Sequence, residues 1–490
     1  MEANNLPLVP STAAIPVQQD RDSFFSKEAI DSTWTRSWDM VCPPVAASAH
    51  DSLTFNLPKL GQGNYYFLQD ARIHVALRLL DKDGAPPAVD GSIAPVEDFA
   101  SAIFSDVKVF FNETQANSNT AGMYPYHSYL NALLSYSAEK KQGSAMVQGF
   151  VGQNRADYNA KPKWPGQKSA FLRRRSMFGN YLDGAHFTYS DATSPPTSAS
   201  APLLTEFSST NMPLISNVGV RIELSRASPN FYLMLDPELA ADAVPAWEAA
   251  LEEKKYKLLI DKIQIVVPVK TMNPSLDLKV EQRLAQKPLE YRTVRMEMSK
   301  KPIAKGLNTF STTQLKQESV CPDRIYFMVV PDYQLNGAKG KNPFHFCSTI
   351  RAEDAAYFDD NRANLEEMRL SINNETLETY ETSSTDETVL RKYLELDQAM
   401  GHGRTSNSSL TFNPEDYREL FFVMGYDLTA AKNAALLGPD IRGMNKEGAM
   451  RLDLRWSRVL PCDCWLVMLS EYHSMIKIDK NRSVMCQYLA

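Results

Sequence analysis

The stretch RIHVALRLL, residues 72–80, carries an apolar side chain at every odd position from 73 to 79, with polar or small side chains between them. Successive side chains of a β-strand point to opposite faces of its sheet. The stretch therefore predicts a strand with one buried face and one wet face. Strands with one buried face and one solvent-exposed face are typical of antiparallel sheets, because parallel sheets are covered on both faces and their strands are apolar throughout.

The same alternation recurs from one end of the chain to the other, at residues 218–224, 262–269, 368–372 and 450–456. Turn segments rich in Gly, Asn, Pro and Ser lie between these strands, at residues 81–84, 336–340 and 401–409. Residues 190–201, SDATSPPTSASA, predict an exposed low-complexity loop. Together these patterns predict a mainly β protein built from sandwiches or barrels.

Three helices are expected as insertions in the long loops between strands. Residues 125–141 place Tyr126, Tyr129 and Leu133 on one face of the first helix. A capping box from Ser384 to Glu387 predicts the start of the second. Asn413 followed by Pro414, the usual N-cap and first-turn pair, predicts the start of the third.

The length of 490 residues is enough for two to four domains at about 150 residues each. The segment Met272-Asn273-Pro274 interrupts the strand-rich sequence and divides it into two portions of similar size, each sufficient for one elaborated sandwich. Pro, Ala and Asn residues dominate the first twenty positions, as in arms that become ordered on contact with a partner. We therefore expect an N-terminal arm at 1–45, a first sandwich at 46–272, a second at 273–480 and a C-terminal tail at 481–490.

Composition and charge exclude several classes of protein. Hydrophobic residues are 43% and charged residues 22%, which is ordinary globular composition. Lys and Arg number 52 against 58 Asp and Glu, so the net charge of −6 argues against a protein that coats nucleic acid. The densest basic run, Arg173–Arg175, is expected in a solvated loop that pairs with neighbouring subunits, with a contact to DNA as the alternative.

The location of the protein is also constrained. No stretch reaches the roughly 18–20 apolar residues that a transmembrane segment needs. The N-terminus does not have the basic and apolar regions of a secretory signal. Six cysteines in 490 residues are too sparse for a disulfide framework, so we expect a chain that matures in a reducing compartment.

No motif predicts catalysis, a cofactor or a metal site. Cys462 and Cys464 suggest zinc only superficially, because zinc needs four ligands and only His473 and Cys486 follow, at unusual spacing. The segment around Gly337–Lys341 does not have the first glycine and the Ser or Thr of a phosphate loop. We expect catalytic residues, cofactor ligands and metal ligands to be absent, and both cysteines to be structural.

Several motifs occur in the order found in one family. These are LTFNLP at 53–58, the helix MYPYHSYLNALLSYS at 123–137, NG followed by NPFHF at 336–346, and MRLDLRW, WLVMLSEY and MIKID within 448–479. In this order they resemble the double jelly-roll major capsid protein of Polinton/Maverick elements and the related adintoviruses. The resemblance extends, in pieces, from about Trp34 to Val484.

The resemblance implies two antiparallel eight-stranded jelly-roll sandwiches side by side, with helical loop insertions. It further implies a hexon-like protein that forms a homotrimer, a pseudo-hexagonal capsomer that contacts neighbouring capsomers and tiles an icosahedral shell. Penton and minor capsid proteins are expected as further partners, and the shell would enclose DNA without sequence-specific binding. The implied location is the virion capsid, assembled inside the host cell in the nucleus or cytoplasm and not secreted.

Four aromatic residues are the candidates for contacts between subunits. Trp34 and Trp38 follow the expected arm, where aromatic side chains often anchor a flexible segment in a groove. Pro343 favours extended geometry at Asn342, so Phe344 and Phe346 would point to the same side, into the core or towards a subunit. Tyr126 and Tyr129 are expected to pack beneath a loop and not to bind a ligand.

Two other functions are compatible with these patterns. A β-sandwich also suits a carbohydrate-binding protein or a glycoside hydrolase, and a hydrolase would need two carboxylates about 5–10 Å apart across a cleft. A host protein domesticated from a mobile element would have the same sequence features. The size of the particle in solution distinguishes a capsomer from a monomeric enzyme.

Overall fold

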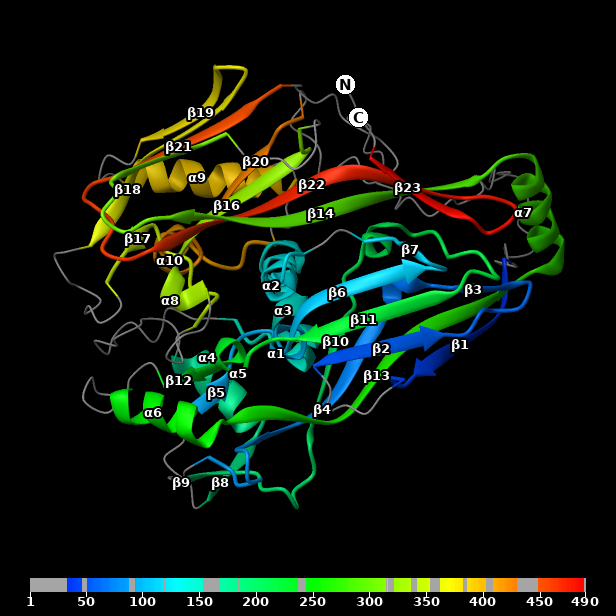
Figure 1. The fold of residues 1–490 in the computed structure, drawn as a ribbon, viewed down its shortest axis with the longest axis horizontal. Coiled ribbons are helices and arrows are strands. Elements are labelled where there is room, and N and C mark those ends of the chain that lie inside the picture. The colour runs from blue at the N-terminus through cyan, green and yellow to red at the C-terminus, as the bar shows by residue number, and fades with distance from the viewer. Residues whose placement is uncertain are drawn as a thin grey trace, which may run out of the picture.

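The structure is a computed structural model of the chain. It describes residues 33–45, 51–87, 93–117, 120–152, 168–182, 186–236, 244–313, 315, 321–335, 342–352, 362–381, 386–401, 409–429 and 448–488. Figure 1 shows two β-sandwiches with their long strands side by side, the first half of the chain below and the second half above. Among the described residues, no helix has the length and apolar character needed to cross a membrane.

The first half forms two antiparallel sheets. One has the order β1-β13-β4-β10, with the short β3 (Asn64–Tyr66) also paired to β13, and the other has the order β2-β11-β6-β7. The main strands are β1 (Trp34–Cys42), β2 (Ser52–Leu57), β4 (Arg72–Leu80), β6 (Phe104–Phe111), β7 (Thr114–Gln115), β10 (Thr197–Pro202), β11 (Val220–Arg226) and β13 (Lys257–Met272).

The second half repeats this arrangement. Its first sheet has the order β14-β22-β16-β20, with β23 (Val484–Tyr488) beside β22, and its second has the order β15-β21-β18, with β17 (Thr349–Ile350) and β19 also paired to β18. The main strands are β14 (Leu289–Ile303), β15 (Thr309–Thr312), β16 (Arg324–Pro331), β18 (Ala363–Ile372), β19 (Glu375–Glu381), β20 (Met424–Asp427), β21 (Met450–Trp456) and β22 (Cys464–Ile478).

Counting the main strands of each half from first to eighth reveals one topology. In both halves one sheet contains the first, eighth, third and sixth strands, and the other contains the second, seventh, fourth and fifth. This is the order of a jelly roll, in which paired strands wind together around one core. The expected pair of antiparallel eight-stranded jelly rolls is confirmed.

The predicted alternation accounts for how the sheets pack. In β4 the odd residues from Ile73 to Leu79 are buried, while Arg72, His74 and Arg78 are exposed or half-buried. The strands β11 and β21 bury every second side chain in the same way. Each sheet therefore turns an apolar face to its partner sheet, and two such faces make the core of a sandwich.

Helices occupy the connections. They are α1 (Phe99–Ala102), α2 (Tyr124–Ser135), α3 (Ala138–Gln142), α4 (Lys168–Ser176), α5 (Pro229–Tyr232), α6 (Val244–Lys254), α7 (Pro274–Gln286), α8 (Asp332–Leu335), α9 (Asp386–Ala399), α10 (Pro414–Leu420) and the 3-10 turns η1 (Leu68–Asp70), η2 (Ser144–Gln148) and η4 (Glu206–Ser209). Two small hairpins, β5 (Ile93–Pro95) with β12 (Leu233–Leu235) and β8 (Gly179–Leu182) with β9 (His186–Tyr189), complete the described elements.

The expected helices are present with altered limits. The helix expected over 125–141 is divided, because Tyr136 has extended geometry and Ser137 starts a new cap for α3. The Asn413 side chain accepts a hydrogen bond from the Asp416 backbone N–H at 2.8 Å, which confirms the predicted start of α10. The helix α9 begins at Asp386, whereas Ser384 of the expected capping box lies outside the described residues.

Three segments expected to be irregular contain strands. Residues 484–488, assigned to the C-terminal tail, form β23, which pairs with β22. Residues 34–42, assigned to the arm, form β1, which pairs with the end of β13 and is an edge strand of the first sandwich. Residues 197–201, the last part of the expected exposed loop, belong to β10 (Thr197–Pro202), which pairs with β4. The strands β1 and β10 lie at the two edges of their sheet, so backbone pairing with a neighbour holds them where their own side chains give a weak strand signal.

The two sandwiches are joined through α7. The strand β13 ends at Met272, the Asn273 side chain caps α7, and β14 begins at Leu289. The far end of the molecule, at the left of Figure 1, holds α4, α6 and α8. The two jelly rolls thus present short connections at one end and long insertions at the other.

Candidate functional site

The junction between the two sandwiches is centred on α2, which lies between them in Figure 1. Ten of the twelve residues of α2 are buried. A helix that is buried on nearly all sides needs partners around its whole circumference. The first sandwich supplies α1 and β6 on one side of α2, and the second sandwich supplies the aromatic residues that follow α8.

An aromatic cluster joins α2 to the second sandwich. The rings of Tyr129 and Phe344 are stacked, with centroids 4.4 Å apart and planes 10° apart. Tyr126 lies edge-on to Phe344 at 5.5 Å, and its hydroxyl donates a hydrogen bond to the Pro343 carbonyl at 3.2 Å. The Asn342 side chain accepts a hydrogen bond from the Phe344 N–H at 3.0 Å, so this turn is fixed before it docks. Aromatic pairs of this kind add about 0.5–1.5 kcal/mol beyond the area that they bury.

A buried lysine reinforces the junction at the end of α2. The Lys141 ammonium donates hydrogen bonds to the Leu133 carbonyl at 2.6 Å and to the Ser409 carbonyl of the second sandwich at 2.5 Å. Burial lowers the pKa of Lys141 to about 8. The carbonyls at the end of a helix carry partial negative charge, which favours a cation at this place. Lys141 therefore connects the two halves through backbone oxygens.

The opposite end of the junction is also connected by hydrogen bonds. The Asn112 side chain donates to the Arg482 carbonyl at 2.8 Å, and the Thr114 hydroxyl donates to the Val484 carbonyl at 3.4 Å. The Arg482 guanidinium donates to the Ser216 carbonyl at 3.0 Å and to Glu281 on α7 at 2.7 Å. With contacts at both ends and in the middle, the angle between the sandwiches is fixed by the chain itself.

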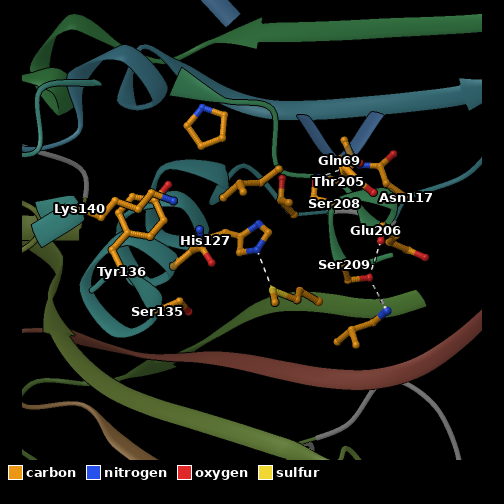
Figure 2. A pocket seen from close by; sticks show the side chains of 16 residues that line it. Gln69, Asn117, His127, Ser135, Tyr136, Lys140, Thr205, Glu206, Ser208 and Ser209 are labelled. Atoms are coloured by element: carbon orange, nitrogen blue, oxygen red, sulfur yellow. Dashed lines mark hydrogen bonds between the residues drawn. The ribbon is translucent and has the colours of Figure 1, made fainter. Parts of the chain in front are cut away.

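A cavity of about 370 Å³ lies within this junction. Figure 2 shows His127 pointing into it from α2. The His127 ring nitrogen Nε2 lies 2.8 Å from the Met296 sulfur, and the Val294 N–H donates to the Ser209 hydroxyl at 2.8 Å. The lining residues are Gln69, Asn117, Thr120, His127, Asn131, Ser135, Tyr136, Lys140, Pro202, Leu204, Thr205, Glu206, Ser208, Ser209, Val294 and Met296.

The chemistry of this cavity differs from that of a glycosidase. Burial lowers the pKa of His127 to about 4, so the ring is neutral at physiological pH. Among the described residues that line the cavity, Glu206 is the one carboxylate, and Arg295 lies 3.6 Å from it. A glycosidase needs a pair of carboxylates that flank the bond to be broken. The cavity therefore has the wrong set of groups for the carbohydrate-cleaving alternative.

The basic run Arg173–Arg175 is not in a solvated loop. It lies on α4, where Arg174 is fully buried and Arg175 nearly so. The Arg174 guanidinium forms an ion pair with the buried Glu97 and donates a hydrogen bond to the Pro95 carbonyl at 2.7 Å. The expectation of a surface contact, with subunits or with DNA, is wrong for Arg174. The three consecutive arginines lie on a helix that buries one side in the core, and the run of charges did not predict this burial.

Cys462 and Cys464 lie where β22 begins. Their sulfur atoms are 4.0 Å apart, Cys464 is buried and Cys462 is half-buried. The Cys462 thiol donates to the Arg351 carbonyl at 3.4 Å. In the part of the chain that the structure describes, no group of three or more His, Cys, Asp or Glu side chains is placed to hold a metal ion.

The four candidate contact residues fall into two pairs. Phe344 and Phe346 have no exposed surface in the single chain, so they serve as core residues, the other role expected for this turn. Trp34 and Trp38 lie on the edge strand β1 and are half-buried. Trp34 packs edge-on against Phe67 at 5.1 Å, while the Arg36 guanidinium lies 5.1 Å from the ring centre of Trp38. Only the tryptophan pair has surface left for a neighbour.

Similarity to known proteins is found at the level of the structure and not of the sequence. No family model matches the sequence, and no curated protein is similar to it. The chain is similar to a structure of the Sputnik virophage, with 10% identity and a TM-score of 0.56 over 97% of this chain and 93% of that chain. It is also similar to the PBCV-1 virus capsid, with 10% identity and a TM-score of 0.53 over 96% of this chain and 100% of that chain.

A third similar structure is the Faustovirus major capsid protein, with 10% identity and a TM-score of 0.52 over 96% of this chain and 93% of that chain. At this identity the similarity concerns the fold. The fold is a double jelly roll. The similar structures are those of viral capsids, and the similarity covers 96–97% of this chain and therefore both sandwiches.

Proposed function

We propose that this chain is the hexon-like major capsid subunit of a virus or virus-like element and acts by self-association, not by catalysis. Three copies form a pseudo-hexagonal capsomer, and capsomers tile an icosahedral shell around DNA. The observation that carries the proposal is the repeat of one eight-stranded jelly roll within one chain. Two similar units in each of three subunits give six similar units around a threefold axis, which is the shape that fills hexagonal positions in a closed shell.

The junction between the sandwiches supports this role. A hexagonal outline requires that both sandwiches of each chain keep one mutual angle. The stacked Tyr129 and Phe344, the buried Lys141 and the contacts of Arg482 hold that angle without help from another subunit. Contacts at both ends and in the middle keep the junction from acting as a hinge.

Further parts of the proposal concern partners and origin. The half-exposed Trp34 and Trp38 are proposed as contacts with a neighbouring copy, and penton and minor capsid proteins as additional partners. The ordered motifs favour an element of the Polinton/Maverick or adintovirus kind, with assembly inside the host cell and no secretion. Within the chain, we propose that the first jelly roll starts at β1 and ends at Met272, and that α7 connects it to the second.

The mass of the purified protein tests the proposal. Size-exclusion chromatography with light scattering should give a stable species of three times 55.0 kDa. Negative-stain images of that species should have a pseudo-hexagonal outline. A species of one chain that hydrolyses a glycan would overturn the proposal. Removal of residues 1–32, which leaves β1 in place, should impair shell assembly but keep the trimer.

A further inference from the structure

The fifth strand and the helix that follows it are covered in the first jelly roll. The strand β7 lies against β23 of the second, where the Thr114 hydroxyl donates to the Val484 carbonyl at 3.4 Å and the Cys486 thiol donates to the Gln115 carbonyl at 3.6 Å. The helix α2, which is the first helix after β7, lies against Phe344 of the second jelly roll. In one chain, therefore, the second jelly roll covers this part of the first.

In the second jelly roll, the fifth strand and the helix after it have exposed surface among the described residues. Its fifth strand, β19, pairs with β18 and lies at the margin of its sheet among the described strands. The first helix after it is α9, which buries Lys392 and Leu396 towards β20. Its other side exposes Leu390 and Leu394, with 45% and 62% of their surface accessible.

The exposed leucines form a small stripe on α9. Residues four positions apart lie on the same face of a helix, so the side chains of Leu390 and Leu394 are neighbours. The Arg391 guanidinium and Glu395 form an ion pair at 3.0 Å beside them. Two leucines with charged flanks are too small a surface for a membrane, which needs a long apolar face. They suit the centre of a protein contact with a polar rim.

We infer that the first jelly roll of a second copy of this chain covers β19 and the exposed face of α9. The inference rests on the proposed trimer. In a ring of six alternating sandwiches, each second jelly roll is followed by the first jelly roll of the next copy. The contact of β7 and α2 within a chain then recurs between chains at β19 and α9. The helix α9 packs on the sixth strand, β20, and α2 packs on the fourth, β6, so the two helices correspond in chain order and not in packing. The leucines exposed on α9 then meet the next copy beside β19.

A double variant tests this assignment. Leu390→Glu with Leu394→Glu places two carboxylates on the proposed contact, at positions that are exposed in the single chain. Leu307→Glu is the matched control, because Leu307 is also an exposed leucine, with 43% of its surface accessible, in the loop between β14 and β15. Light scattering over a dilution series gives the mass, and thermal unfolding reports whether each variant is folded.

The expected result is a species of three times 55.0 kDa for the natural chain and for the Leu307 variant. The double variant should have the mass of one chain at concentrations at least tenfold above those at which the natural trimer dissociates. A folded double variant that remains trimeric like the natural chain would overturn the inference and leave the proposed function standing. A natural chain that has the mass of one chain at every concentration would overturn both.

Hydrogen exchange on the natural chain gives a second measurement that no variant can disturb. Amides of α9 and β19 should exchange at least tenfold more slowly in the trimer than in the diluted chain, while β4 amides in the core should not change. Equal exchange of α9 and β19 in both samples would overturn the inference even if the double variant failed to fold.

Discussion

The eighth strand of the first jelly roll, β13, and that of the second, β22, occupy the same place in one topology and are buried differently. Along β13 buried residues alternate with half-buried or exposed ones. Along β22 every residue from Leu466 to Met475 is buried. One face of β13 is therefore exposed to solvent in the single chain, whereas both faces of β22 are covered from Leu466 to Met475.

The cover of the second sheet comes from its own insertions and from the first jelly roll. The Leu396 side chain on α9 packs close to Gly425 of β20. The Trp465 indole donates to Asp332 of α8 at 2.6 Å, and Met296 of β14 contacts His127 of α2. Two strands with the same place in the topology therefore differ in exposure, because insertions and the first jelly roll cover β22 and leave one face of β13 in solvent.

The largest effect on stability is expected at Phe344, where the second jelly roll packs against α2 of the first. Phe344→Ala removes a fully buried ring that stacks on Tyr129, so the free energy of unfolding should fall by about 3–5 kcal/mol. Phe310→Ala, on the half-buried edge strand β15, is the control and should cost clearly less. Urea unfolding of both variants measures the difference. Equal losses would mean that the junction is no better packed than a sheet edge.

The next largest effect on stability is expected for the charged residues that are buried on β22 and its neighbour β16. Glu471 on β22 lies 2.5 Å from Arg324, and burial raises the pKa of Glu471 despite that partner. Glu471→Ala leaves Arg324 without this partner in a buried site and should cost about 3 kcal/mol. The wet sheet offers the matched pair Arg78 and Asp261, where Asp261→Ala should cost at most about 1 kcal/mol. Similar costs for both variants would contradict the difference between the two sheets.

His127 makes the junction sensitive to acid. Its pKa is lowered to about 4 by burial, from 6.5 in the unfolded chain. Between pH 6.5 and 4 the unfolded chain therefore binds more protons, and stability should fall by about 2–3 kcal/mol as the pH falls through this window. Above pH 6.5 His127 adds no pH dependence.

The control for this acid sensitivity is His127→Gln, which cannot titrate. Lys140 and Glu206 line the same cavity and remain in both proteins. The difference in unfolding free energy between the natural chain and the variant should therefore vary with pH only in the stated window. Thermal unfolding from pH 4 to pH 8 measures it, and a constant difference would mean that His127 is not buried as described.

The sequence predicts the sheets better than the contacts between them. Alternation at 72–80 and 450–456 is a local property of each strand, and the structure confirms it. The stacking of α2 on the turn after α8 joins residues such as Tyr126 and Pro343, 217 positions apart, and no local pattern names such a partner. The spacing of Tyr126 and Tyr129 indicated packing, and the order of motifs indicated the fold, but neither could indicate the cavity.

Misjudged segments show which signals are ambiguous. Arg173–Arg175 is a charge run by composition, yet the ion pair with Glu97 places Arg174 inside the fold. The strand β10 consists largely of Ser and Ala, whose small side chains give little strand preference without the neighbour β4. Asn273 and Pro274 were interpreted as a boundary between the sandwiches, which remains a proposal, and their helix-start signal, which predicts α7, was passed over.

The smallest effect compares one residue type in the two eighth strands. Val467 of β22 is fully buried, whereas Val266 of β13 is half-buried on the wet face. Val467→Ala removes two buried carbon atoms and should cost about 2 kcal/mol, and Val266→Ala should cost under about 1 kcal/mol. The measurement is urea unfolding of the single-chain form, obtained by dilution. The same two variants can be compared in the trimer. If Val266→Ala then costs as much as Val467→Ala, a second copy covers the exposed face of β13 in the trimer. The contrast between the two strands would in that case hold only for the isolated chain.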